Sequence, residues 1–347
     1  MIYIADQTDL VPHLFALSDQ FVRCKDHADV EIWPAAISNE ITESSDVFTI
    51  FVNQECNIHF AEHQYYKHRV LRPNSIFAIT AFNSNYPWPF STIKFWSNIY
   101  MTFKNNKNLQ PLDVDIKPYD GCALFGGWEV GRARMFDRLQ HLNLVDQCLI
   151  NLQPKWIDND RFTLQQRLQH KTYRSPQLPD LDLLEFNNLA YTATGLNTMM
   201  LTDNNRYSWV SLKIPWQLYN HSYLSIVAET EFFPWQDTIF LTEKIAKPLI
   251  AGHPFMIYGG PGILKYLQVY GFQTFSSWID ESYDVLQGEN RADAMIRSFA
   301  KFSKQPADAK LDMFKEMQTV CKHNQRLATD PEFLLSPIVE TILQKFC

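Results

Sequence analysis

Short apolar runs bounded by polar residues recur along the N-terminal part of the chain. The runs at 46–53 and 75–82 are rich in β-branched and aromatic side chains, which is typical of buried strands. Between residues 9 and 22 the apolar positions instead recur at helical spacing, as on one side of an amphipathic helix. The pattern therefore predicts strands and a helix in this part of the chain.

The clearest pattern is a strand, a helix and a strand between residues 122 and 152. The apolar run at 122–125 ends in Gly126 and Gly127, helical spacing follows over 132–142, and a second apolar run covers 147–152. Short strands that alternate with helices favour a parallel sheet with crossover helices. We therefore expect an α/β fold.

The pattern then dissolves over residues 153–209, which are polar and contain prolines. We expect an irregular insertion there, with one helix near 162–169. Beyond it the alternation resumes, with these expected elements in order: a strand at 222–228, a helix at 243–250, a strand at 254–258, a helix at 263–270 and amphipathic helices beyond residue 288.

Residues 104–118 separate the two parts of the chain. The segment is polar, contains Pro111 and Pro118 and has no periodicity, which is typical of a linker. A chain of 347 residues is also too long for one ordinary core. We therefore predict an N-terminal domain over 1–115 and a C-terminal domain over 116–347, which includes the insertion and a helical tail.

Composition and charge exclude several classes of protein. The net charge of −7 argues against a general nucleic-acid binder, which needs a basic surface. Six cysteines without CxxC spacing argue against a zinc ribbon or a disulfide framework and favour reduced thiols in the cytoplasm. The N-terminus lacks the basic and apolar regions of a signal peptide, and no apolar run reaches the length of a membrane span. We expect a cytoplasmic protein with no membrane span.

An adjacent acid and base at the start of an expected helix are the main candidates for chemistry. Glu229 follows a predicted strand, and Thr242, Glu243 and Lys244 begin the next helix. Open α/β sheets bind ligands where the carboxyl end of a strand meets a helix N-terminus, because free N–H groups and the helix dipole favour phosphate. Lys244 would pair with a diphosphate, while Glu243 or Glu229 would accept hydrogen bonds from sugar hydroxyls. The alternative is a first-turn acid that stabilises the dipole beside a solvated lysine.

Two further segments bear on such a site. Tyr258, Gly259 and Gly260 begin a glycine turn through which a backbone can approach a ligand, although Gly-Gly-Pro-Gly also makes an ordinary turn between a strand and a helix. Arg132 and Arg134 begin a helix, where a cation opposes the dipole, and this indicates an anion nearby. The alternative is that both arginines are exposed to solvent. The acidic segment 280–284 is expected to form a solvated loop.

One motif points to a different chemistry. His59, Glu62 and His63 match HxxEH, which in inverted zinc proteases places two histidine ligands on one face of a helix. No downstream helix that would carry a third, acidic ligand is evident in the sequence. A polar helix with surface histidines is therefore preferred to a zinc hydrolase.

Four segments follow one another in the second half of the chain: 131–139, which begins Gly-Arg; 223–230, which ends Glu-Thr; 241–244, Leu-Thr-Glu-Lys; and 254–261, which ends Gly-Gly-Pro. In this order they resemble the nucleotide-sugar domain of the family ten fucosyltransferases and of GT-B glycosyltransferases from marine viruses and bacteria. The resemblance covers roughly residues 120 to 285. It implies a GT-B-like fold, with two Rossmann-like domains, a cleft between them and C-terminal helices.

The resemblance also implies roles for individual residues. Arg132 and Lys244 would bind the donor diphosphate, Glu243 would hold the ribose, and Glu229 would act at the donor sugar. The remaining expected nucleotide-sugar contacts are Thr242, Tyr258, Gly259 and Gly260. Arg and Lys can stabilise a leaving nucleoside diphosphate without a metal, so no metal is expected.

Such enzymes are inverting, so a carboxylate from the N-terminal domain would deprotonate the acceptor. Glu55 is the candidate base, and Glu62 is the alternate. The expected function is transfer of a sugar from a GDP- or UDP-linked donor to a hydroxyl of a glycan or lipopolysaccharide-type acceptor. Because the family's Glu-Asn is Glu229-Thr230 here, the identity of the sugar and of the base stays open.

Two alternatives remain at this stage. One is a glycosyltransferase that acts on modified DNA bases, which the net charge disfavours. The other is a catalytically inactive module that binds nucleotides or glycans. In each case the protein is expected in the cytoplasm of a bacterium or of an infected host cell.

Overall fold

The protein has a mixed α/β fold, which confirms the predicted fold class at this level. The computed structural model describes residues 2–6, 16–23, 28–34, 47–53, 75–79, 81–82, 92–94, 96–127, 130–153, 173–174, 200–201, 207–208, 212–229 and 239–346. The candidate base Glu55, the HxxEH motif at 59–63 and the helix predicted near 162–169 lie outside these residues.

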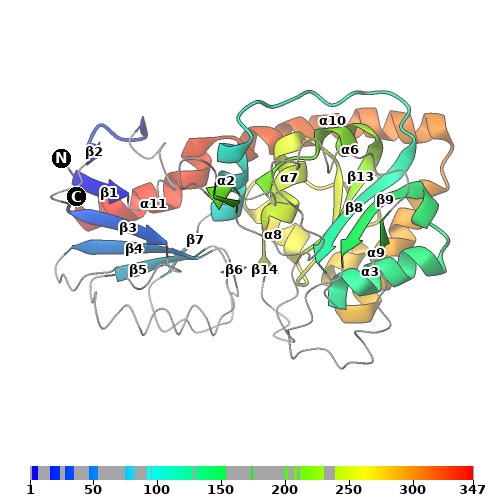
Figure 1. Cartoon of the computed structure of the whole chain (residues 1–347), viewed down its shortest axis with the longest axis horizontal. Helices are drawn as coiled ribbons and strands as arrows, with labels where there is room; N and C mark the ends of the chain where they lie inside the picture. The colour runs from blue at the N-terminus through cyan, green and yellow to red at the C-terminus, as the bar shows by residue number, and fades with distance from the viewer. Residues whose placement is uncertain are drawn as a thin grey trace.

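The N-terminal part of the chain forms a six-stranded parallel sheet (Figure 1). In spatial order its strands are β2 (Phe21–Arg23), β1 (Ile2–Asp6), β3 (Val30–Pro34), β4 (Phe48–Asn53), β5 (Ser75–Ile79) and β7 (Thr92–Lys94). Every neighbouring pair is parallel. Strands β4 and β5 lie within the two apolar runs of the sequence, because these runs supply the β-branched and aromatic side chains that suit a buried sheet.

Two details of this region differ from the prediction. The helix expected over 9–22 is wrong at its end, since Phe21–Arg23 is strand β2 and pairs with β1. Burial of Phe21 in the sheet outweighs the local helical spacing. The run expected as one strand to residue 82 is divided, and its end forms β6 (Ala81–Phe82), which pairs with β14 (Ile239–Phe240) in an antiparallel ribbon.

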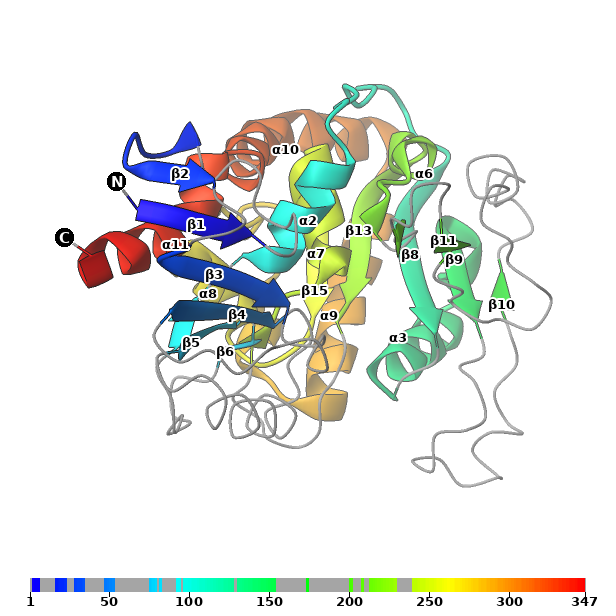
Figure 2. The same ribbon diagram turned by 60° about the vertical axis from the view of Figure 1, so that its left-hand side comes forward.

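A second sheet of five strands forms the C-terminal part (Figure 2). In spatial order its strands are β10 (Tyr173–Arg174), β9 (Cys148–Gln153), β8 (Tyr119–Gly127), β13 (Ser222–Ala228) and β15 (Phe255–Tyr258). Only the pair of β10 and β9 in this sheet is antiparallel. The last four strands match the apolar runs predicted for them, although β8 is longer than expected at its N-terminal end.

Helices cover both faces of this second sheet. Helices α3 (Val130–His141) and α9 (Gly288–Ser303) pack against each other on one face. Gly121 in β8 lets α9 approach closely, because a Cβ atom there would lie 2.9 Å from the ring of Phe299. On the other face lie α6 (Trp216–Asn220), α7 (Glu243–Ala251) and α10 (Ala307–Ala328). The helices at α3, α7 and α8 (Ile263–Val269) confirm those predicted from the sequence.

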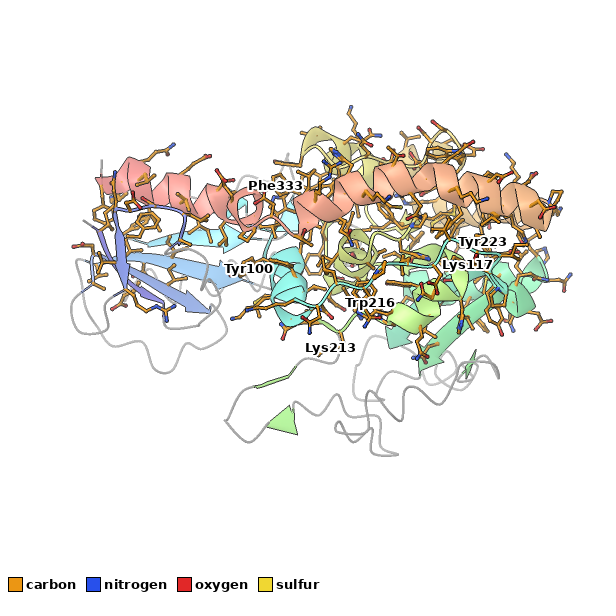
Figure 3. All side chains as sticks on the ribbon, turned by 90° about the horizontal axis from the view of Figure 1, so that it is seen from above. Tyr100, Lys117, Lys213, Trp216, Tyr223 and Phe333 are labelled. Atoms are coloured by element: carbon orange, nitrogen blue, oxygen red, sulfur yellow. The ribbon has the colours of Figure 1, made fainter. Side chains whose placement is uncertain are left out.

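The helical tail runs along both sheets. Helix α10 lies over the C-terminal sheet, and α11 (Pro331–Phe346) continues over the N-terminal sheet (Figure 3). There the ring of Phe346 meets that of Phe48 in β4, with centroids 6.2 Å apart. Helix α2 (Ser97–Asn105) packs against α7 and α11 at the junction. Among the helices of the described ranges, none is long and apolar enough to cross a membrane.

The segment predicted as a linker has little regular structure. Residues 106–118 contain no helix or strand, whereas Lys104 and Asn105 belong to the end of α2. The segment is anchored where Lys117 donates hydrogen bonds to the carbonyl oxygens of Asp113 and Asn220. The domain boundary proposed near residue 115 stays a prediction.

Candidate functional site

The carboxyl ends of three neighbouring strands bring the predicted site residues to one edge of the C-terminal sheet. Strands β8, β13 and β15 are parallel neighbours, so their carboxyl ends share an edge. Arg132 follows β8 in the first turn of α3, Glu229 follows β13 directly, and Gly259 follows β15. The fold thus brings together segments that lie more than a hundred residues apart.

Glu229 is engaged by the start of helix α7. Its carboxyl group is buried and accepts hydrogen bonds from the backbone N–H of Thr242, at 3.0 Å, and from the Thr242 hydroxyl. Burial raises the pKa of Glu229, while Lys244 and the Thr242 hydrogen bonds oppose this change. Both carboxyl oxygens therefore fix the position of Thr242, and the role of Glu229 at a donor sugar stays a prediction.

Thr242 is the N-cap residue of α7. Its backbone is extended, and its hydroxyl oxygen accepts hydrogen bonds from the backbone N–H and from the Nζ of Lys244, both at 3.2 Å. A threonine in this position satisfies one of the donors that a helix leaves unpaired at its start. The same hydroxyl donates to Glu229, so it links β13 to the first turn of α7.

The predicted acid–base pair is an ion pair. Lys244 Nζ lies 2.8 Å from Glu243 Oε1, and both side chains are about one-fifth exposed. Burial alone would raise the pKa of Glu243, but the ammonium groups of Lys244 and Lys247 outweigh it and lower the pKa to about 2. Glu243 is therefore ionised at neutral pH, and it holds Lys244 at the edge of the sheet.

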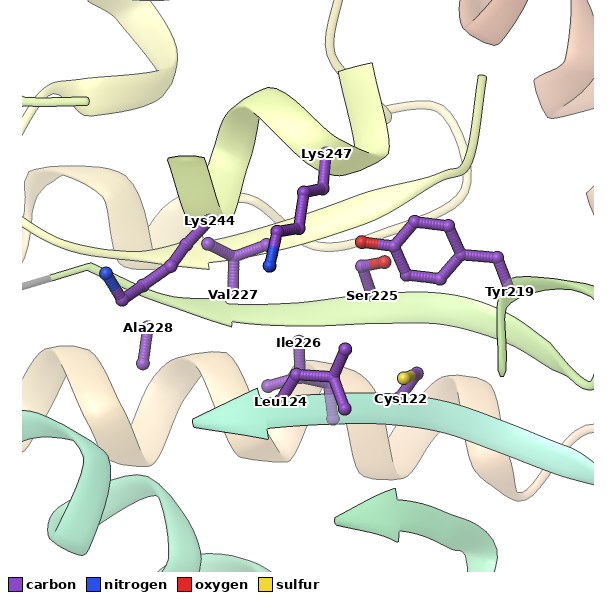
Figure 4. A pocket seen from close by; sticks show the side chains of 9 residues that line it. All are labelled: Cys122, Leu124, Tyr219, Ser225, Ile226, Val227, Ala228, Lys244 and Lys247. Carbon is purple, nitrogen blue, oxygen red and sulfur yellow. The ribbon is translucent and has the colours of Figure 1, made fainter. Parts of the chain in front are cut away.

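A small cavity of about 30 Å³ lies between α7 and the sheet (Figure 4). Its lining includes Lys244 and Lys247 from α7, Ser225 from β13, Tyr219 from α6 and Cys122 from β8. Burial lowers the pKa of Lys247 to about 8. Lys247 was not among the candidate residues from the sequence, although its spacing of three residues from Lys244 places both on one face of a helix.

A hydrogen-bonded chain lies behind the cavity. His253 Nε2 lies 2.9 Å from the carbonyl oxygen of Ser222, and His253 Nδ1 lies 2.9 Å from the hydroxyl of Ser225. Because a carbonyl only accepts, Nε2 carries the proton, and Nδ1 accepts from Ser225. Burial lowers the pKa of His253 to about 4, so the ring is neutral at pH 7. The ring of Tyr219 stacks on it at 4.6 Å.

The glycine turn after β15 is held by internal contacts. Asp284 accepts hydrogen bonds from the backbone N–H groups of Leu264 and Lys265 at the start of α8, and the buried Arg291 holds Asp284 at 3.0 Å. The expectation of a solvated loop at 280–284 is therefore wrong at Asp284, which is buried. Its buried carboxylate accepts hydrogen bonds from the free N–H groups at the start of α8 and neutralises the guanidinium of Arg291.

The residues of the turn itself pack against the strand ends. A Cβ atom on Gly259 would lie 2.9 Å from Cδ1 of Ile263, so the glycine lets the start of α8 approach the turn closely. Tyr258 is buried, and its hydroxyl donates to the carbonyl oxygen of Gly288. Gly260 is half-buried beside them. Contacts of Tyr258, Gly259 and Gly260 with a nucleotide stay predictions.

The arginines of α3 differ in their surroundings. Arg132 is buried, whereas Arg134 forms an ion pair with Glu289 of α9 at 2.7 Å. Arg138, one turn further on, bonds both Glu289 and Asp293. The anion that the sequence indicated near Arg134 is thus a carboxylate of α9. The binding of a diphosphate by Arg132 stays a prediction.

Metal ligands and disulfides are two further features that a site of this kind can have. Within them, no group of three or more His, Cys, Asp or Glu side chains is placed to hold a metal ion. Cys122, Cys148 and Cys321 are buried free thiols. Burial raises the pKa of Cys122 to about 12, so this thiol is protonated beside the cavity.

The fold and the site together define an α/β protein with a polar cluster at the carboxyl edge of a largely parallel sheet. No protein-family model matches the chain, and no curated protein matches it. The function is therefore inferred from the site.

Proposed function

We propose that this protein is a glycosyltransferase that uses a nucleoside-diphosphate sugar as donor. The observation that carries the proposal is the first turn of α7, where Lys244 lies beside the carboxyl end of β13 and lines a cavity. A cation and helix dipole at such an edge favour a phosphate group. The order of the sequence motifs around this turn supports a sugar nucleotide as the source of that phosphate.

In this proposal the described residues of α7 act on the leaving group. Departure of the sugar leaves negative charge on the diphosphate, and the Lys244 ammonium stabilises that charge. Glu243 keeps Lys244 in place through their ion pair and accepts a hydrogen bond from the ribose. Glu229 and Thr242 position the turn, because their hydrogen bonds fix the end of β13 to the start of α7.

We further propose a GT-B-like arrangement, with the donor on the C-terminal sheet and the acceptor on the N-terminal side. Its support is the presence of two sheets joined by α2 and by the tail helix α11. The ribbon of β6 and β14 brings a segment of the N-terminal part beside the strand that leads to Thr242. An acceptor hydroxyl of a glycan or lipopolysaccharide would be deprotonated by Glu55, with inversion at the sugar and without a metal.

The test is nucleotide binding by the full chain. UDP, GDP, CDP and ADP are compared in thermal-shift measurements, and titration calorimetry then follows the nucleotide that stabilises the protein. Lys244→Met is expected to weaken binding by about tenfold or more, since a charge-assisted hydrogen bond contributes roughly 1.5–3 kcal/mol. Lys265→Met is the matched control, because Lys265 is exposed on α8 and the substitution removes the same charge.

Three results would count against the proposal or restrict it. Absence of stabilisation by all four nucleotides would overturn the donor site. Equal binding by Lys244→Met and the parent protein would remove Lys244 from it. Binding without hydrolysis or transfer of any donor sugar would favour a nucleotide-binding module over an enzyme.

A further inference from the structure

The cavity beneath α7 contains more positive charge than its own carboxylates neutralise. Lys244 and Lys247 both line it, and Glu243 is the carboxylate that forms an ion pair with Lys244. The other nearby acid, Glu229, is engaged with Thr242, and burial raises its pKa. One ammonium group therefore has no close counter-ion among the described residues.

That group belongs to Lys247. Within the residues that the structure describes, its Nζ makes neither a hydrogen bond nor a close ion pair, and Glu243 attracts it from a longer distance. Figure 4 shows its side chain extending from α7 toward β13, beside that of Lys244. The Lys244 ammonium lowers the pKa of Lys247, so the two groups repel each other, and an anion bound between them would offset this repulsion.

The size and chemistry of the cavity limit what this anion can be. A cavity of about 30 Å³ has room for one or two water-sized groups, so it cannot hold a sugar or a base. It can take oxygen atoms of one phosphate group while the rest of the ligand lies outside. Two ammonium groups on one helical face suit a phosphate with two negative charges.

We propose that Lys247 binds the terminal phosphate of a nucleoside diphosphate, and that it makes the site select diphosphates over monophosphates. This assignment rests on the proposed function for the identity of the ligand, while the binding of a phosphate group to Lys247 does not depend on it. In this arrangement Lys244 binds both phosphates, and Lys247 binds the terminal one.

The charged and titratable groups around Lys247 give the site a characteristic dependence on pH. From α7, Glu243 raises and Lys244 lowers its pKa; from β8 comes the protonated thiol of Cys122, and from α6 the phenol of Tyr219, whose pKa burial raises. Burial dominates and lowers the pKa of Lys247 to about 8. A bound phosphate favours the charged form, so binding near pH 8 takes up a proton at Lys247.

The experiment compares diphosphates with monophosphates by titration calorimetry on the full chain. UDP, GDP, CDP and ADP are each paired with the corresponding monophosphate, and inorganic pyrophosphate and inorganic phosphate are measured separately. The variants are Lys247→Met, Lys247→Arg as the charge-retaining rescue, and Lys265→Met as the control for an exposed lysine. Lys247→Met removes a buried charge and keeps the linear side chain, so it is expected to fold, and its circular dichroism and thermal midpoint check this.

Lys247→Met is expected to weaken the binding of the diphosphate by about tenfold and to change the affinity for the monophosphate by less than about twofold. Lys247→Arg is expected to restore most of the preference. In buffers of different ionisation enthalpy at pH 8, the parent protein takes up protons on binding the diphosphate, and Lys247→Met takes up fewer. A role of Lys247 in structure alone would not alter this proton uptake.

The outcomes separate this inference from the proposed function. Nucleotide binding with an unchanged preference in Lys247→Met overturns the inference alone, as does an equal loss of diphosphate and monophosphate. Binding of pyrophosphate through Lys247 without binding of any nucleotide supports the phosphate subsite. It overturns the proposal that the donor is a nucleoside-diphosphate sugar. Failure of every phosphate compound to bind the parent protein overturns both.

Discussion

The protonation state of a buried polar residue in this protein depends on the contacts that bury it. His253 lies fully inside the C-terminal part, and both of its ring nitrogens are engaged, one by Ser225 and one by Ser222. The sequence shows only a histidine between a glycine and a proline. That neighbourhood predicts a turn, but it does not indicate a neutral, buried ring, because the partners come from a strand some thirty residues earlier.

At this scale we predict that His253 makes the protein less stable in mild acid. Burial lowers its pKa from 6.5 to about 4, so between these values the unfolded chain binds a proton that the folded protein does not. Stability therefore falls as the pH falls through this window, by about 2 kcal/mol at pH 5 relative to pH 7.5 from this residue. Urea unfolding at the two pH values measures the change.

His253→Gln is expected to be less stable at pH 7.5 but to lose most of this pH dependence, because glutamine does not titrate. His221→Gln is the control, since His221 is exposed and the substitution should leave the pH dependence as it is. If His253→Gln retained the full loss of stability between pH 7.5 and 5, the assigned titration would be incorrect.

At the scale of elements, helix α7 shows how a local signal and a distant partner combine. The sequence Thr-Glu-Lys before an apolar periodic stretch predicts a helix that begins after Thr242, and the structure has this start. Local sequence contains the capping threonine but not its partner Glu229, which follows β13 and lies thirteen residues earlier in the chain. The sequence therefore predicts an acid in the first turn, at Glu243. It does not predict that hydrogen bonds to Glu229 support the capping threonine.

We predict that the Thr242 hydroxyl stabilises this element substantially. Thr242→Ala is expected to lower the free energy of unfolding by about 2 kcal/mol, because it removes the N-cap and leaves the buried Glu229 with one donor fewer. Thr242→Ser retains the hydroxyl and is expected to lose less than about 1 kcal/mol. Urea unfolding of both variants tests the difference, and equal losses would show that the methyl group, not the hydroxyl, is what matters.

At the scale of the whole molecule, the tail connects the two sheets. The amphipathic pattern beyond residue 288 predicts helices, and α9, α10 and α11 confirm this. The pattern does not say against what their apolar faces pack. In the structure α11 lies against the N-terminal sheet although it follows the C-terminal sheet in the chain (Figure 1), so its last turns stabilise the opposite end of the molecule.

We predict that Ile342, which is fully buried in α11, couples the tail to the N-terminal sheet. Ile342→Ala is expected to cost about 3 kcal/mol of stability, as for other large-to-small changes in a core. Gln344→Ala, at an exposed position of the same helix, is expected to change it by less than about 0.5 kcal/mol. Hydrogen exchange then locates the effect.

Faster exchange is expected in β4 and β5 of the Ile342→Ala variant, with β13 and β15 little changed. Faster exchange in all four strands to the same extent would instead indicate that the two sheets unfold as one unit.

The sequence by itself determined the α/β class, strands β4 and β5, four strands of the C-terminal sheet, most of the helices in the described ranges, and the order of the candidate residues along the chain. These properties depend on local patterns: apolar runs of strand length, helical spacing and capping residues. The sequence did not predict strands β1, β2, β3 and β7 of the N-terminal sheet. The helix expected over 9–22 shows the limit of such patterns, because pairing with β1 made its end a strand.

Only the tertiary structure decided which charged groups face one another. Parallel pairing of β8, β13 and β15 brings Arg132, Glu229 and Gly259 to one edge, and packing of α7 on β13 turns Lys247 toward a cavity. Charge and burial depend on distances between segments that are far apart in the chain, so local sequence cannot contain them. For that reason the sequence indicated Lys244, and the folded chain was needed to reveal Lys247.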